Sequence, residues 1–188
     1  MSIEKFKYKK TIEAIRFILT HEHYLMMDKN KLMAILYASD RILLDKRGTS
    51  LTGASYLKNI NGIYMFGIES IIDQNLLTYK LGDLSELYLC KDKVYSIYSS
   101  NDSDLSVFSE NELDAITEAY IDFVNVPDLI VPLITFIKFK ETRSIRKKDT
   151  LISTRAILRA IGKKEDYINN TISENKSITY VHEILKCD

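Results

Sequence analysis

Few residues of this chain have types and spacing that could support chemistry, and the first of them are a histidine pair. His21 and His23 are separated by one residue, and His182 or Cys187 could complete a metal site with them. Imidazole and thiolate groups bind Zn²⁺, but these positions lack the spacing of a zinc motif. We therefore expect a solvated helix end at His21–His23, and neither a metal nor a cofactor in the protein.

Asp40 is the carboxylate that the sequence singles out, because it falls on the edge of an apolar helical stripe. Burying a carboxylate is costly unless it accepts hydrogen bonds. The Thr52-Gly53 pair offers a hydroxyl and a backbone N–H, so we predict that Asp40 links its helix to this turn. Direct contact between Asp40 and a partner is the alternative.

Catalytic patterns are missing from the sequence. Acid–base catalysis by Asp40 would need a second group, and no such group is identifiable. The chain also lacks a glycine-rich phosphate loop, a paired cysteine motif and a nucleophile elbow. We expect a protein that is not an enzyme.

A basic segment at Lys138–Lys148 is the one local excess of charge, with six Lys or Arg residues against Glu141. We favour a solvated connector here. The alternative is a surface that contacts phosphate or an acidic protein face. Apart from Phe139, no aromatic residues alternate with the bases as in a binder of single-stranded nucleic acid.

The helix that positions Asp40 has clear sequence signals at both ends. Asp28 can cap its first turn, and Gly48 can adopt the left-handed conformation that ends it. Between them, apolar residues recur at helical spacing and form one face. These residues are Leu32, Ile35, Leu36, Leu43 and Leu44.

Other segments are predicted from periodicity, capping signals and turn residues. We expect helices at 5–20, 63–77, 109–125 and 128–139, an extended segment at 55–60, and a β-hairpin of 87–90 with 94–98. Helices at 153–161 and 163–175 would form a C-terminal helical hairpin, and 177–186 would dock as a last helix or strand. The fold class expected is mainly α (α+β), a compact helical domain spanning 1–188 with a small β-hairpin and the helical hairpin at about 150–175.

Composition narrows the class of protein. The chain has 188 residues, 46% of them hydrophobic, and its formal net charge is zero from 26 basic and 26 acidic residues. This balance does not favour binding to nucleic acid or membrane. Cys90 and Cys187 form no motif and are expected to be reduced thiols in a cytoplasmic protein.

A family resemblance lies in the stretch from Lys31 to Tyr56. The run K-L-x-x-x-L-Y-x-S-D-R, followed by L-x-x-x-G-x-x-L-T-G-x-x-Y, resembles the core of the Panacea (SocA-like) antitoxin domain. The predicted capping-box helix and the C-terminal helical hairpin are also similar to elements of that family. In place of the family's proline-containing turn, this chain has Ile63, Tyr64 and Met65 after Gly62.

The resemblance implies an antitoxin that neutralises a cognate toxin protein by binding it, or a proteolytic adaptor that delivers the toxin to a protease. A homodimer is left open. The alternative function is a nucleic-acid-binding regulator of a phage or mobile element that uses 138–148. We expect some residues to bind the toxin or to shape the surface that does so: Tyr37, Asp40, Thr52, Gly53, Tyr56, Gly62, Tyr64 and Met65.

Two of these expectations concern burial. Tyr37 and Tyr56 are expected to be core tyrosines whose hydroxyls reach water, because a buried phenol needs a polar partner. The exposed side of Asn59–Phe66 is the candidate toxin-binding patch, since it holds more apolar residues than a solvent-facing turn needs. The alternative is that all of these apolar side chains belong to the core.

Overall fold

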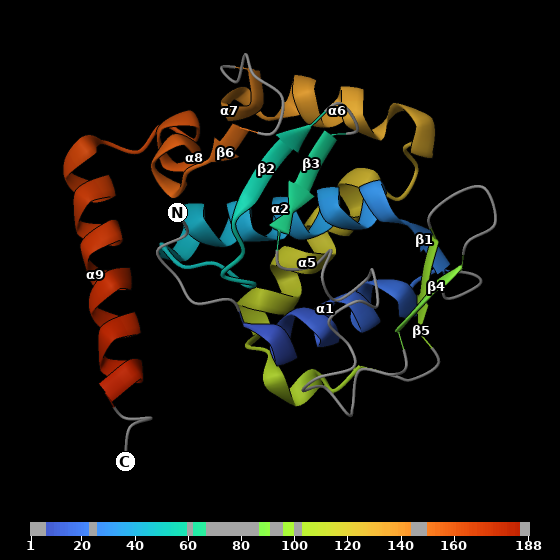
Figure 1. Ribbon diagram of the computed structural model, residues 1–188, viewed down its shortest axis with the longest axis horizontal. Coiled ribbons are helices and arrows are strands. Elements are labelled where there is room, and N and C mark those ends of the chain that lie inside the picture. Colours follow the sequence, from blue (N-terminus) through green and yellow to red (C-terminus); the bar gives the residue numbers. More distant parts are fainter. Residues whose placement is uncertain are drawn as a thin grey trace.

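The computed structural model describes residues 7–22, 26–59, 62–66, 87–90, 96–99, 103–143 and 150–184. Within these residues, most of the chain is helical and the strands form two small antiparallel sheets, so the predicted mainly helical α+β class is confirmed. Figure 1 shows helix α2 crossing the centre of the molecule, with α1 and α5 on one side of it and the hairpin of β2 and β3 on the other.

Helix α2 (Lys29–Arg47) is the core of the fold. Asp28 caps it as predicted, because its Oδ1 accepts bonds from the N–H groups of Asn30 and Lys31 at 2.9 and 3.1 Å. Gly48 ends it with a φ of 71°, also as predicted. Burial is wider than the predicted single face, since every residue from Leu32 to Asp40 is buried. A helix with no solvated face in its middle must be enclosed by other elements.

Those enclosing elements come from distant parts of the chain. Helix α1 (Tyr8–Thr20) lies within the predicted helix 5–20 and buries Ile12, Ile15, Ile18 and Leu19. Helix α5 (Glu110–Phe123) packs along α2 and begins at the predicted capping box. There the Glu112 carboxylate accepts bonds from the backbone N–H and hydroxyl of Ser109 at 2.9 and 3.1 Å.

One sheet has the strand order β3-β2-β6. Strands β2 (Tyr56–Asn59) and β3 (Gly62–Met65) form an antiparallel pair, and β6 (Thr150–Ile152) adds to the other edge of β2. The predicted helix at 63–77 is therefore wrong over 63–65, where the backbone pairs with β2. A short apolar run does not by itself distinguish a strand from a buried helix. Residues 67–77 lie outside the described part of the chain.

Gly62 allows β3 to approach the helix that covers the sheet. Its φ is 113°, and a Cβ atom at this position would lie 3.4 Å from the Cα of Pro132. A side chain here would have to adopt a conformation that L-residues rarely adopt. Gly62 thus serves the close packing of the hairpin on its neighbour.

The second sheet has the order β1-β5-β4. Strands β4 (Leu87–Cys90) and β5 (Ser96–Ser99) confirm the predicted hairpin, although Val94 lies outside the described residues. Strand β1 (Met26–Asp28) pairs with β5 and was not predicted, because three residues give no detectable alternation.

A run of short helices follows α5. The 3-10 turn η2 (Asp128–Ile130) leads into helix α6 (Val131–Lys138), which lies within the predicted helix 128–139 and has Pro132 in its first turn. Another 3-10 turn, η1 (Leu105–Val107), precedes α5. Helix α7 (Lys140–Arg143) follows α6 within two residues. Together, η2, α6 and α7 lie across the end of the molecule beside β2 and β3 (Figure 1).

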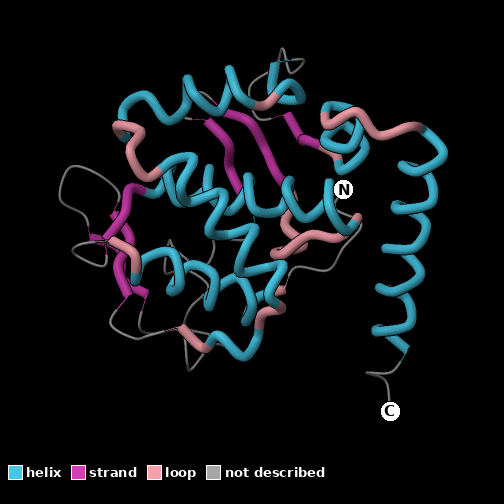
Figure 2. The backbone as a smooth tube through the Cα atoms, turned by 180° about the vertical axis from the view of Figure 1, so that it is seen from behind, coloured by secondary structure: helices cyan, strands magenta, loops and turns pink. Residues whose placement is uncertain are grey.

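The chain ends in two helices, α8 (Thr154–Ala160) and α9 (Glu165–Ile184). Both views place α9 along one side of the molecule (Figures 1 and 2). Ile168 of α9 is buried, whereas Tyr167 is 39% exposed. The predicted end of this helix at residue 175 is wrong, because α9 continues to Ile184. Asn175 holds α9 to the end of α2 by donating to the carbonyl oxygen of Gly48 at 3.1 Å.

Within the described residues, no single helix has the length and apolar composition needed to cross a membrane. The pair Glu110–Phe123 and Asp128–Lys138 meets that test only when the two are taken together, and they are bent by 101°.

Candidate functional site

Asp40 holds the turn formed by residues 50–53, and the predicted link is confirmed. Its Oδ1 accepts bonds from the N–H groups of Leu51 at 2.5 Å and Thr52 at 2.9 Å, and its Oδ2 accepts one from the Thr52 hydroxyl. The backbone N–H of Gly53 was also a predicted donor, but it donates to the Ser50 hydroxyl oxygen at 3.0 Å. Asp40 is fully buried, so these bonds replace the water that a carboxylate would otherwise bind.

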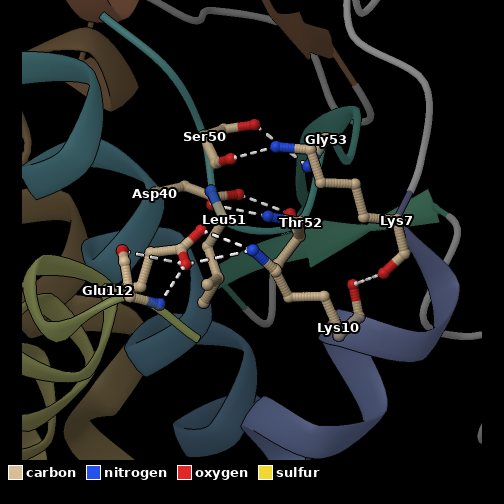
Figure 3. Close-up of polar contacts among 10 residues, drawn as sticks. Lys7, Lys10, Asp40, Ser50, Leu51, Thr52, Gly53 and Glu112 are labelled. Atoms are coloured by element: carbon tan, nitrogen blue, oxygen red, sulfur yellow. Dashed lines mark hydrogen bonds and ion pairs between the residues drawn. The ribbon is translucent and has the colours of Figure 1, made fainter. Parts of the chain in front are cut away.

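The N-terminal end of α1 holds the same turn from its other side. Figure 3 shows Lys7 beside Ser50 and Thr52. The Lys7 ammonium donates to the carbonyl oxygen of Ser50 at 2.6 Å, and its backbone N–H donates to that of Thr52 at 2.8 Å. In the same view, Lys10 pairs with Glu112 at 2.8 Å and joins α1 to the start of α5. The turn at residues 50–53 is therefore fixed to α2 by Asp40 and to the start of α1 by Lys7.

A second buried carboxylate, Glu141, was not singled out by the sequence. It lies on α7 and is 3% exposed. Its Oε1 accepts bonds from the Tyr37 hydroxyl at 2.6 Å and from Nε of Arg41 at 2.8 Å, both from α2. The sequence offered one indication of Glu141, which is the single acidic residue of the basic segment. Its partners could not be identified from the sequence, because they lie about a hundred positions earlier in the chain.

Tyr37 and Tyr56 connect the surroundings of the two carboxylates. Their rings meet edge to face with centroids 4.7 Å apart. The Tyr56 hydroxyl lies 3.3 Å from the Thr52 hydroxyl, and that of Tyr37 donates to Glu141. Both tyrosines are core residues as predicted, but the expectation that their hydroxyls reach water is wrong, because buried protein groups satisfy them.

This arrangement acts as a framework. Each carboxylate accepts bonds from donors of the protein itself, and both are buried away from any substrate. A general base must instead reach the proton that it removes. Asp40, Thr52, Gly53, Tyr37 and Tyr56 therefore lie together as a structural unit that holds the sheet and α7 against α2.

Tyr37 is expected to make the protein sensitive to alkali. Burial first, and the negative charge of Glu141 next, raise the pKa of its phenol well above the usual 10.0. Above about pH 10 the unfolded chain loses this proton while the folded chain keeps it, so the free energy of unfolding falls by about 1.4 kcal/mol per pH unit. Urea unfolding between about pH 9 and pH 11 should show a shallower fall for Tyr37→Phe than for the wild type.

Tyr167→Phe is the control for this measurement, because the Tyr167 ring is exposed. We expect its stability to follow that of the wild type over the same pH range. Equal slopes for the wild type and Tyr37→Phe would contradict the assignment of this alkaline loss to Tyr37.

The predicted patch at Asn59–Phe66 is only partly a surface. Ile63 and Met65 are 5% and 0% exposed, so Met65 can contribute to the framework but not to a binding face. Tyr64 is half-buried and Phe66 is 66% exposed. This alternation follows from β3 being a strand, in which successive side chains point to opposite faces.

A larger exposed apolar face lies on η2 and α6, which contain none of the predicted toxin-binding residues. One side of α6 is buried through Val131 and Thr135. The rest of η2 and α6 carries four apolar residues, one on η2 and three on α6, that are between 39% and 93% exposed. We call these four residues the α6 apolar surface: Leu129, Leu133, Phe136 and Ile137.

A groove of about 550 Å³ lies between the hairpin and α6, and we call it the α6 groove. Its apolar lining comes from Ile63 on β3, from Leu129 on η2 and from Pro132, Leu133 and Phe136 on α6. Lys58 of β2 contributes a cation to it. The α6 groove thus opens beside the α6 apolar surface and shares Leu129, Leu133 and Phe136 with it.

The remaining predicted candidates are engaged in local contacts or lie outside the described residues. Nδ1 of His21 lies 2.8 Å from the carbonyl oxygen of Phe17, at the end of α1. No group of three His, Cys, Asp or Glu side chains suited to a metal occurs in the described part of the chain, which excludes His23, Cys187 and the His182 side chain. In the basic segment, the Lys138 ammonium pairs with the Asp122 carboxylate. Residues 144–149 of this segment lie outside the described part of the chain.

Comparison of the chain with protein-family models, with curated proteins and with solved structures found no match.

Proposed function

We propose that this chain is a cytoplasmic antitoxin that neutralises a toxin protein by binding it directly, without catalysis. The observation that supports binding to another protein is the α6 apolar surface. The toxin as partner comes from the resemblance of Lys31–Tyr56 to the Panacea antitoxin domain. Occlusion of the toxin is the mode proposed, with delivery to a protease as the second mode implied by the resemblance.

The exposure of the α6 apolar surface supports a binding role. Leu129 of η2 is 93% exposed, and Leu133, four residues later on α6, is 56% exposed. Contiguous exposed apolar residues of this kind mark interaction sites, because covering them removes apolar area from water. The fold holds α6 by its opposite side, so a partner can cover this surface without disturbing the core.

The buried framework suits the same role. Glu141 fixes α7, which follows α6, to Tyr37 and Arg41 of the central helix. A binding surface held rigidly loses less conformational freedom when a partner covers it. The proposal therefore assigns Asp40 and Glu141 to the support of the surface, and the α6 apolar surface to contact with the toxin.

Leu133→Asp is the variant that tests this proposal. A charge in the centre of an apolar interface should weaken binding about tenfold or more, while an exposed position should leave the fold intact. The chain would be co-expressed with the product of its neighbouring gene, and both growth and co-purification measured. We expect wild-type protein to restore growth and bring down the toxin, and Leu133→Asp to do neither.

Ile121→Asp is the matched control, because Ile121 is 66% exposed on α5. It should neutralise as the wild type does. Full neutralisation by Leu133→Asp would contradict the proposal for α6. Loss of function in a triple Arg146, Lys147 and Lys148 to Glu variant, with Leu133→Asp active, would favour the nucleic-acid-binding alternative.

A further inference from the structure

Lys58 is a cation in the α6 groove, and its contacts with the described residues are made with uncharged groups. Its ammonium donates to the carbonyl oxygen of Thr142 at 3.0 Å and lies 4.1 Å from the centroid of the Phe136 ring. No carboxylate of the described residues forms an ion pair with it. An ammonium has three donors, so Lys58 can donate further bonds into the groove.

Its surroundings make that charge costly. Burial lowers the pKa of the Lys58 ammonium, because the charged form loses water that the groove does not replace. The nearby ring face and carbonyl stabilise the charge only in part. An anionic group that enters the groove would complete this compensation.

The other charges around the groove do not offer a competing site. Asp128 also lines it, but its carboxylate lies 2.6 Å from the Lys31 ammonium. The opposite charges of Asp128 and Lys31 thus compensate each other within the protein. The rest of the lining is uncharged: it combines apolar side chains, among them Ile63, Leu133 and Phe136, with the polar residues Asn30, Thr135 and Thr142.

We propose that the α6 groove docks a segment of a partner protein in which an acidic side chain stands among apolar ones. The carboxylate accepts bonds from the Lys58 ammonium, and the apolar side chains lie against Leu133 and Phe136. This inference rests on the proposed function, since it specifies the chemistry of the partner that the α6 apolar surface binds.

A protein segment fits better than a small carboxylate, because the apolar area extends beyond the groove. Ile137 is 52% exposed four residues after Leu133 on α6, and it does not line the groove. A small molecule in the groove would leave the Ile137 side chain in water. A polypeptide segment can fill the groove and cover the adjoining surface as well.

Selection from a display library of random 12-residue peptides on the full-length protein provides the probe. We expect the selected peptides to combine Asp or Glu with Leu, Ile or Phe. Synthetic copies with a fluorescent label would then be titrated against the protein by anisotropy. Lys58→Met keeps much of the packing on Phe136 but removes the charge, so Kd should rise about tenfold or more.

The matched control is Lys164→Met, which removes an exposed lysine remote from the groove and should leave Kd within about twofold. Replacing the acid of the peptide by Asn or Gln should raise Kd for the wild type but not for Lys58→Met. Lys58→Glu should instead select peptides with Lys or Arg. A reversal of the charge found in the selected peptides would show direct contact between residue 58 and the charged side chain of the peptide, even if one variant is less stable.

Several results would overturn the inference. These are peptides selected without an acid, no selection at all, or equal affinity of Lys58→Met and the wild type. Competition by free N-acetyl-aspartate as effective as that by the peptide would assign the groove to a small carboxylate instead. Failure of peptide selection while Leu133→Asp still abolishes neutralisation would remove this inference and leave the proposed function standing.

Discussion

Replacing Asp40 by Ala should lower the free energy of unfolding by about 3 to 5 kcal/mol, because two buried backbone N–H groups would lose their acceptor. These groups belong to Leu51 and Thr52, both of which are fully buried. The Thr52 hydroxyl can turn to Tyr56 at 3.3 Å, so it contributes less to the loss. Urea unfolding followed by circular dichroism at neutral pH would measure the difference.

Two further variants make this measurement specific. Asp45→Ala is the control, since Asp45 forms an exposed pair with Lys163 and should cost no more than about 1 kcal/mol. Asp40→Asn keeps an acceptor for the backbone donors. Its loss of unfolding free energy should therefore lie between the losses of Asp40→Ala and Asp45→Ala. An Asp40→Ala protein as stable as Asp45→Ala would remove the structural role and favour direct contact between Asp40 and a partner.

Replacing Glu141 by Ala should cost about 3 to 5 kcal/mol as well, because it leaves buried partners of an ion pair without their acceptor. The Tyr37 hydroxyl and Nε of Arg41 both donate to the Glu141 carboxylate, and the Arg41 side chain is only 23% exposed. Glu141→Gln keeps an acceptor without the charge and should cost less. Thermal and urea unfolding would rank the three proteins.

Glu118→Ala controls for the loss of a glutamate, because Glu118 and its partner Lys46 are both more than half exposed. Its stability should stay within about 1 kcal/mol of the wild type. If Glu141→Ala unfolded at the same urea concentration as Glu118→Ala, Glu141 would not support the fold.

The two carboxylates also act on the α6 groove. Asp40 holds the turn that leads into β2, the strand that carries Lys58. Glu141 immediately precedes Thr142, whose carbonyl oxygen accepts the bond from Lys58. Both walls beside Lys58 are thus tied to α2, which explains how a core helix can position a surface groove.

The helices could be predicted from the sequence because the interactions that delimit them are local. Asp28 bonds to N–H groups two and three residues later, and Glu112 reaches back three residues to Ser109. Gly48 ends α2 through its own backbone conformation. Each signal lies within about one helical turn of the residues it affects.

The strands were predictable only where their pattern was long enough. The hairpin of β4 and β5 carries a β-rich run on each strand, whereas β1 and β6 have three residues each. The segment Ile63–Met65 is apolar and fits either a strand or a buried helix. Pairing with β2 decided the matter, because it satisfies the backbone of β3 through a neighbouring strand.

The sequence alone thus determined where α2 begins and ends and where α5 begins, and that Asp40 must find donors nearby. Tertiary structure decided that Glu141 turns inward, because its partners Tyr37 and Arg41 lie about a hundred positions away. It also decided that α6 buries Val131 and Thr135 while Leu129 and Leu133 face water. Both sides of α6 are apolar, and only the position of α2 and the sheet selects the one that is covered.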